Sequence, residues 1–226
     1  MGQKEKKIVK FNIAIDGPVG SGKTTIGQLV AKKLGYQFFD SGLLYRYFAF
    51  FYQQNNSLGS GGEKEKLLLL WKDWLAGNRK KIVADLEKLR GQLSSPEISD
   101  LASRLSPLPE LRKIILDFQR ELTEEKGWVV VGRDITSEVL PNAKIKIFLT
   151  ASLEERARRR NKQYEIKLSS EAVKKELQNR DERDEKRKNS PLKKTADSWE
   201  LDTTYLSPTE SVEKIFLYLN EKLRSG

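Results

Sequence analysis

Gly17-Pro18-Val19-Gly20-Ser21-Gly22-Lys23-Thr24, followed by Thr25, matches the pattern G-x-x-x-x-G-K-[ST] at every defined position. The apolar residues 10–16 before it predict a short strand, and a helical repeat follows it as far as Gly35. Glycines allow successive N–H groups to point inward at a phosphate, and the start of a helix adds partial positive charge. In such a turn the lysine reaches the β- and γ-phosphates, and the next hydroxyl holds Mg²⁺. We therefore predict that residues 17–25 bind a nucleoside triphosphate, with Mg²⁺ held by Thr24.

Beyond this turn, apolar strands and amphipathic helices alternate to the end of the chain. Further strands are predicted at 36–40, 128–131, 145–149 and 198–201. Helices are predicted at 67–75, 82–89, 109–125 and 170–188, and others start at or near Ser41, Ser95, Ser152 and Ser207. The alternation predicts an α/β fold, a three-layer sandwich whose central parallel sheet carries helices on both faces. A glycine- and serine-rich linker at 55–62 opens an inserted subdomain that we expect to end at residue 92, so that 1–54 and 93–226 form the core.

The composition excludes several kinds of chemistry. The 226 residues include no cysteine and no histidine. Disulfides, thiolate metal sites and thiol nucleophiles are therefore excluded, as are a Ser-His-Asp hydrolase and any metal centre that depends on histidine. The reaction must use carboxylates, hydroxyls, lysine, arginine and backbone amides.

The net charge of +10 predicts an anionic partner, which could be nucleic acid, a membrane surface or a small phosphate ester. The positive residues gather in the helices after residue 152 and in the N-terminal tail, and no nucleic-acid motif interleaves aromatic residues with them. No apolar run approaches the roughly 20 residues of a membrane span, and residues 1–10 lack the apolar stretch of a signal peptide. We therefore expect a cytoplasmic monomer whose partners are small-molecule nucleotides, with no nucleic acid and no membrane.

The phosphate-binding turn, or P-loop, occurs in switch GTPases, in motor ATPases and in small kinases. The chain has no N-K-x-D guanine motif, and the P-loop domain occupies nearly its whole length, so a small-molecule kinase is favoured. A kinase for UMP, shikimate or dephospho-coenzyme A remains an alternative on the same fold. A nucleic-acid-binding NTPase is the alternative from another class, and a steep salt dependence of DNA or RNA binding would favour it.

Five blocks along the chain together resemble one known family. They are Ile15-Asp16-Gly17-Pro18, Asp40-Ser41-Gly42-Leu43-Leu44-Tyr45-Arg46, Val131-Gly132-Arg133-Asp134-Ile135, 146–157 and 180–192. In order and spacing they resemble bacterial cytidylate kinases, P-loop nucleoside monophosphate kinases. The resemblance implies transfer of the γ-phosphoryl group of ATP to CMP or dCMP. It also implies that 55–92 is the monophosphate-binding subdomain and that 158–177 is a lid.

The resemblance further implies which residues carry the reaction. Arg46, Arg133 and Arg187 would hold the acceptor's phosphate, and Arg159 would come from the lid to the transferring phosphoryl group. The expected catalytic set is Lys23, Arg133, Arg159 and Arg187. Arginine suits these positions because its planar guanidinium can bind two phosphate oxygens at once.

The remaining expected contacts are to the sugar and base. By resemblance, Arg180 and Asp184 would contact the sugar and base of CMP, and Ser103 and Arg112 would read the edge of cytosine. Ser41 would line the acceptor pocket. Arg180, Asp184 and Arg187, with Arg183, are spaced to share one helix face, a pattern that a solvated helix laced with ion pairs would also show.

Asp134 follows Arg133 in its block and is expected to orient it. The chain departs from the family at 92–95, where an expected arginine is missing, and at Thr136, where a glycine is usual. The insert also shows a helical pattern where a small sheet is expected. The arginines at 156, 158 and 160 are interpreted as ordinary solvated charges.

Overall fold

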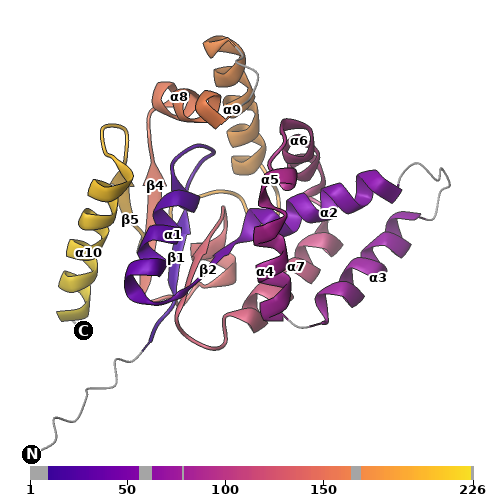
Figure 1. Ribbon diagram of the computed structural model, residues 1–226, viewed down its shortest axis with the longest axis horizontal. Helices are drawn as coiled ribbons and strands as arrows, with labels where there is room; N and C mark the ends of the chain where they lie inside the picture. The colour runs from indigo at the N-terminus through magenta and orange to yellow at the C-terminus, as the bar shows by residue number, and fades with distance from the viewer. Residues whose placement is uncertain (1–9, 56–62, 78, 164–168, 225–226) are drawn as a thin grey trace, which may run out of the picture.

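The computed structural model describes residues 10–55, 63–77, 79–163 and 169–224, and a five-stranded sheet forms its centre (Figure 1). The strands are β1 (Ile13–Asp16), β2 (Gln37–Asp40), β3 (Trp128–Val131), β4 (Ile145–Thr150) and β5 (Trp199–Asp202). Their order is β2-β3-β1-β4-β5, and every pair is parallel. All residues of β1 and β3 are buried, as expected of a parallel sheet covered on both faces. The predicted fold class is confirmed.

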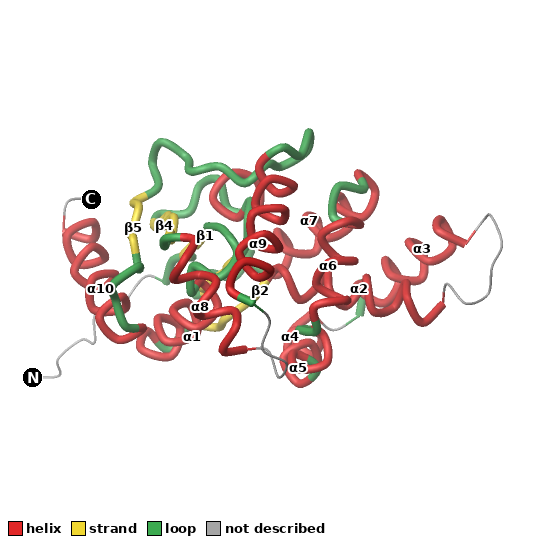
Figure 2. Tube along the Cα trace, turned by 90° about the horizontal axis from the view of Figure 1, so that it is seen from above, coloured by secondary structure: helices red, strands yellow, loops and turns green. Residues whose placement is uncertain are grey.

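Helices cover the sheet on both sides and also extend away from it. They are α1 (Lys23–Leu34), α2 (Ser41–Asn55), α3 (Glu63–Leu75), α4 (Arg79–Lys88), α5 (Arg90–Leu93), α6 (Pro96–Leu105), α7 (Pro109–Leu122), the π-helix η2 (Ile135–Val139), α8 (Leu153–Gln163), α9 (Ser170–Glu185) and α10 (Pro208–Arg224). Seen from above, α10 lies at one end of the molecule and α3 at the other, with α8 and α9 over the middle (Figure 2). None of the helices in the described part of the chain is both long and apolar enough to cross a bilayer.

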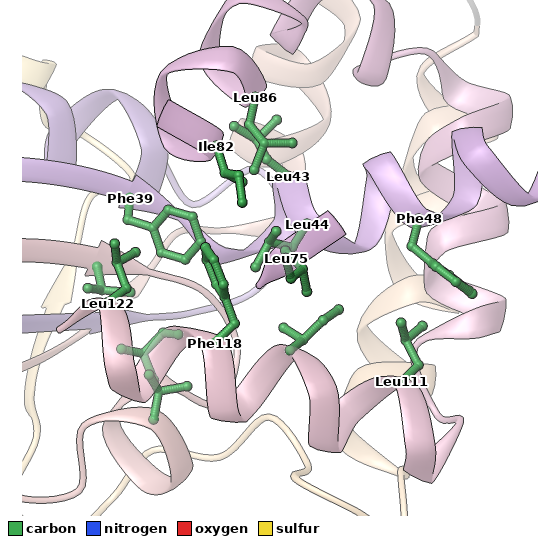
Figure 3. Packing of buried hydrophobic residues seen from close by; sticks show 14 of the residues in the cluster. Phe39, Leu43, Leu44, Phe48, Leu75, Ile82, Leu86, Leu111, Phe118 and Leu122 are labelled. Atoms are coloured by element: carbon green, nitrogen blue, oxygen red, sulfur yellow. The ribbon is translucent and has the colours of Figure 1, made fainter. Parts of the chain in front are cut away.

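Two apolar clusters hold the layers together because alternate strand residues face opposite sides. Ile13 and Ile15 pack with α1 and α10 on one side. Ala14 and Phe39 lie in the other cluster, which also contains residues of α2, α3, α4 and α7 (Figure 3). The sheet is therefore fixed from both faces, and the ends of its strands keep fixed positions for the site.

The insert is helical, as its sequence pattern predicts, and not a small sheet. Trp71 of α3 and Leu86 of α4 are almost fully buried against Phe48 of α2 and Leu111 of α7. Figure 3 shows Leu75, Ile82 and Leu86 of the insert meeting residues of α2 and α7 in one core. The insert thus shares the core of the helices beside it. The linker expected at 55–62 falls almost entirely outside the described residues.

One predicted helix start differs from its expected form. Ser152-Leu153-Glu154-Glu155 has the sequence of a reciprocal capping box, and the Glu155 N–H does donate to Ser152 Oγ at 3.2 Å. The return bond is missing: the Ser152 N–H donates to Thr204 Oγ1 at 2.8 Å. The Glu155 carboxylate instead accepts from Arg158 and Arg159. Glu155 therefore orients Arg159, which lines the cavity described below.

Candidate active site

A cavity of about 800 Å³ opens at the carboxyl ends of the strands, where parallel α/β sheets bind their ligands. The P-loop lines its middle and α8 and α9 one side, while α2, α6 and the turn after β3 line another. Each of the predicted residues Lys23, Ser41, Arg46, Ser103, Arg112, Arg133, Asp134, Arg159, Arg180, Asp184 and Arg187 lines this cavity. Segments far apart in the sequence therefore meet at one site.

The P-loop adopts the backbone that its glycines predict. Gly22 has a φ of 90°, which side chains disfavour. A Cβ atom at Gly17 would lie 2.0 Å from the carbonyl oxygen of Leu149, so only glycine fits between the loop and β4. The loop leads directly into α1, whose first residues, Lys23, Thr24 and Thr25, line the cavity. This geometry suits a bound phosphate.

Lys23 lies inside this loop. Its Nζ donates to Pro18 O at 2.6 Å and to Ser21 Oγ at 3.2 Å. Burial lowers the pKa of the Lys23 amine well below its usual value, and the positive charge of Arg133 lowers it further. An anionic phosphate in the loop would favour the charged amine again.

Arg156 of α8 and Asp181 of α9 connect the P-loop to these two helices. Arg156 donates to Val19 O at 3.1 Å and to Asp181 of α9, and Asp181 accepts from the Val19 N–H at 3.1 Å. Arg156 is only 9% exposed, so its interpretation as a solvated charge was wrong. Arg158, by contrast, is largely exposed and pairs with Glu155.

Thr24 and Asp40 form the part of the site suited to Mg²⁺. Thr24 Oγ1 donates to Asp40 Oδ2 at 3.1 Å, which leaves the lone pairs of the hydroxyl available to a cation. Hydroxyl and carboxylate oxygens are ligands that Mg²⁺ accepts, usually together with water and substrate phosphates. No group of three or more acidic residues that could hold a metal occurs in the described ranges.

Asp40 also caps α2, which begins at Ser41. Its Oδ1 accepts from the Gly42 N–H at 3.0 Å, whereas Ser41 Oγ accepts from Gln119 at 2.6 Å. Burial alone would raise the pKa of the Asp40 carboxyl, but Arg46 and Arg90 lower it to about 2. Arg90 lies close to the 92–95 segment where the expected arginine is missing.

Three charged side chains gather where the acceptor's phosphate is expected. Arg133 Nε donates to Asp184 Oδ2 at 2.9 Å, and Arg187 Nη1 lies 3.6 Å from Asp184 Oδ1. Burial opposes ionisation of Asp184, but the two guanidiniums hold its pKa below the usual value. The expectation that Asp134 orients Arg133 was wrong, because Asp184 is the carboxylate that contacts it.

Asp134 instead pairs with Arg112, and both side chains are buried. Arg112 Nη1 also donates to Ser106 O at 3.2 Å, which fixes the guanidinium at the α6 end of the cavity. Ser103 Oγ and Arg112 Nε are buried without a hydrogen-bond partner among the described residues. Ser103 and Arg112 thus both line the cavity, and each keeps a polar atom that a ligand could satisfy.

The charged face of α9 is divided between two roles. Arg180 and Asp184 line the cavity, whereas Arg183 donates to Asp100 at 2.9 Å. Arg187 lies beyond the end of α9 and reaches the cavity from the segment that follows. Burial and the neighbouring guanidiniums of Arg133 and Arg160 lower the pKa of Arg180 to about 10. Such crowding of positive charge favours an anionic ligand.

Arg159 lies at the edge of the P-loop and contacts another strand end. Its Nη1 donates to Thr203 Oγ1 at 3.0 Å and its Nη2 to Thr203 O at 2.6 Å. The expected lid segment is better anchored than its composition suggests, because Val173 and Leu177 are fully buried against Val19. The part of that segment at 164–168 falls outside the described residues.

Asp16 supports the site without lining the cavity, and the sequence patterns gave it no functional role. Its carboxylate accepts from the Ile135 and Thr136 N–H groups at 2.9 and 2.7 Å and from Thr136 Oγ1 at 2.7 Å. It thereby holds the start of η2 and the turn that carries Arg133. Burial raises the pKa of Asp16 to about 6 despite these hydrogen bonds. Its position in the sequence could have indicated this role, because Asp16, like Asp40, is an acidic residue at the end of an apolar strand.

A P-loop on a parallel sheet of this order, facing an arginine-lined cavity, defines the class of small P-loop kinases. The fold is similar to that of a shikimate kinase from Bacteroides thetaiotaomicron, with a TM-score of 0.50 and 13% identity over 94% of this chain and 99% of that one. It is also similar to an uncharacterised protein from Eubacterium ventriosum, with a TM-score of 0.54 and 14% identity over 94% and 99%. At such identities the likeness concerns the fold alone.

The family follows from sequence. The model of the cytidylate kinase family matches residues 13–221. A cytidylate kinase from Thermotoga maritima is 39% identical over 221 residues, 95% of this chain and 99% of the relative. One from Carboxydothermus hydrogenoformans is 38% identical over 218 residues, 94% and 98% of the two chains. The chain belongs to the cytidylate kinase family, as the resemblance predicted, and is thus a nucleoside monophosphate kinase.

Proposed function

We propose that this chain transfers the γ-phosphoryl group of ATP to CMP or dCMP, giving CDP or dCDP, and that it acts as a cytoplasmic monomer with Mg²⁺. One observation supports the acceptor site most directly. Five residues lining the cavity each carry a buried polar atom without a hydrogen-bond partner in the described part of the chain. The atoms are Arg46 Nε, Ser103 Oγ, Arg112 Nε, Arg180 Nε and Arg187 Nη2. Buried donors are costly unless a ligand satisfies them, so this cavity is suited to an anionic, polar ligand.

At the donor end, the P-loop amides and Lys23 would bind the triphosphate. Thr24, oriented by its bond to Asp40, would hold Mg²⁺, which neutralises charge on the phosphates when bound. Arg159 lies beside Gly22, since a Cβ there would be 3.6 Å from the Arg159 Nη1 atom. A modest movement away from Thr203 would bring this guanidinium to the transferring group.

At the acceptor end, Arg46, Arg133 and Arg187 would hold the monophosphate. Their guanidiniums converge from α2, from the turn after β3 and from the segment after α9, with Asp184 fixing the last two. The second pKa of a phosphate monoester is about 6, so the attacking oxygen is already ionised at neutral pH. The reaction therefore needs positioning and charge neutralisation more than a general base, which agrees with a chain without histidine.

Recognition of the nucleoside would come from the α6 and α9 sides. Arg180 and Asp184 would contact the sugar and base, and Ser103 and Arg112 would contact the edge of cytosine. Asp134 would keep the Arg112 guanidinium in place, and Ser41 would line the pocket below it. A site built from hydrogen-bonding groups rejects bases that leave those groups unpaired.

An acceptor screen tests this proposal. Purified protein with ATP and Mg²⁺ is offered CMP, dCMP, UMP, TMP, AMP, GMP, shikimate and dephospho-coenzyme A in turn, and nucleoside diphosphate or other product is measured. We expect the highest kcat/KM with CMP and dCMP. Faster phosphorylation of UMP, AMP, GMP, TMP, shikimate or dephospho-coenzyme A would contradict the proposal.

A further inference from the structure

A single carboxylate oxygen joins the insert to both halves of the site. Asp40 Oδ2 accepts from Thr24 Oγ1 at 3.1 Å, from Arg46 Nη2 at 3.3 Å and from Arg90 Nη1 at 2.9 Å. Thr24 belongs to the P-loop and Arg46 to the acceptor site, whereas Arg90 comes from α5 at the end of the insert. The Asp40 side chain is only 9% exposed, so water screens these charges weakly.

Arg90 and Arg46 differ greatly in how far nearby carboxylates neutralise their positive charge. Arg90 donates to Asp40 and also to both carboxylate oxygens of Glu87, at 2.8 and 2.6 Å. Arg46 has one longer bond to Asp40, and its buried Nε has no hydrogen-bond partner within the described residues. Burial lowers the pKa of Arg46, since Asp40 only partly offsets it and Arg90 adds repulsion. The Arg46 guanidinium therefore retains charge and donors that an anion can use.

Resting on the proposed function, we propose that Arg90 is a positioning residue for the acceptor: it holds Asp40 away from full pairing with Arg46 and so keeps Arg46 available for the monophosphate. A carboxylate that faced Arg46 alone would form a closer, two-bond pair with it. The acceptor's phosphate would then have to break that pair before it could bind. Arg90 does not line the cavity, so it acts through Asp40 rather than by touching the substrate.

The inference makes opposite predictions for Arg90, in the middle of the Glu87–Arg90–Asp40 chain, and for Glu87 at its end. Arg90→Ala releases Asp40 to Arg46 and should raise the KM for CMP about tenfold, the size expected for a charged hydrogen bond, with kcat and the KM for ATP within about twofold. Glu87→Gln removes a competitor for Arg90, so Arg90 holds Asp40 more firmly. This variant should leave the KM for CMP at or below that of the wild type.

Arg79→Ala is the matched control, because it removes another arginine of the insert, one that pairs with Glu121 on α7. It should leave both KM values unchanged. If Arg90 only tethers the insert, Glu87→Gln and Arg90→Ala should raise the KM for CMP alike, and that result would overturn the inference. A KM for CMP within twofold of wild type in Arg90→Ala would do the same.

If Arg90→Ala does not fold, Arg90→Gln keeps the stem, removes the charge and carries the same expectation. Wild-type protein that phosphorylates neither CMP nor dCMP refutes the proposed function and, with it, this inference. An active wild type with an unaffected Arg90 variant refutes the inference alone.

Discussion

Replacing Asp16 by asparagine should change how the stability of the protein depends on pH. Asp16 is fully buried at the end of β1, where it accepts hydrogen bonds from Ile135 and Thr136. Its folded-state pKa is raised from 3.8 to about 6, chiefly because burial disfavours the charged form. Asparagine has nearly the same shape and keeps an accepting oxygen, but it cannot ionise.

The direction of the effect follows from proton binding. Between pH 4 and 6 the folded wild type binds more protons at Asp16 than the unfolded chain, so its free energy of unfolding falls as the pH rises. A pKa difference of about two pH units corresponds to roughly 3 kcal/mol. This stabilisation is present below about pH 4 and is lost as the pH rises through 6. The free energy of unfolding of wild type minus that of Asp16→Asn should therefore fall by roughly 2 kcal/mol from pH 4 to pH 7, because at pH 4 the unfolded-state carboxyl is already partly ionised.

Urea unfolding followed by fluorescence of the four tryptophans measures this difference at each pH. Carboxylates with lowered pKa values, such as Asp40, weaken both proteins at acid pH and cancel in the comparison. Asp117→Asn, which changes a half-exposed carboxylate on α7, serves as the control for removal of a carboxylate at the surface. A difference between wild type and Asp16→Asn that stays constant with pH would refute the reasoning.

Three further predictions concern catalysis and ligand binding. Lys23→Ala should cut turnover by about a hundredfold or more with an unchanged circular dichroism spectrum, and near-normal turnover would remove Lys23 from the mechanism. Ser103→Ala should raise the KM for CMP by about tenfold without changing that for ATP, and equal effects on both would contradict its place at the acceptor base. ATP and CMP analogues together should slow hydrogen exchange at 158–163 while the sheet is unaffected, and equal exchange in both states would rule out movement of Arg159 on closure.

Contiguous stretches of sequence were enough to predict the fold class and the phosphate site. The P-loop and its flanking strand and helix lie within residues 10–35, so their hydrophobic periods and glycines could be recognised without distant contacts. The helices of the insert were predicted in the same way. Thr203 and Arg90 were missed because no local pattern distinguishes them from the other threonines and arginines of the chain.

The partners of the charged residues depended on tertiary structure. Asp134 was assigned to Arg133 because the two are adjacent in sequence, yet adjacent residues on an irregular turn point in different directions. The parallel sheet and its crossovers bring Asp184 to Arg133 from 51 residues away and Asp181 to Val19 from 162 residues away. Charge type, spacing and local conformation are properties of a segment and can be read from its residues. Which opposite charges meet depends on how whole layers pack, and that long-range arrangement determines which arginine is buried, which is solvated and which is left available for phosphate.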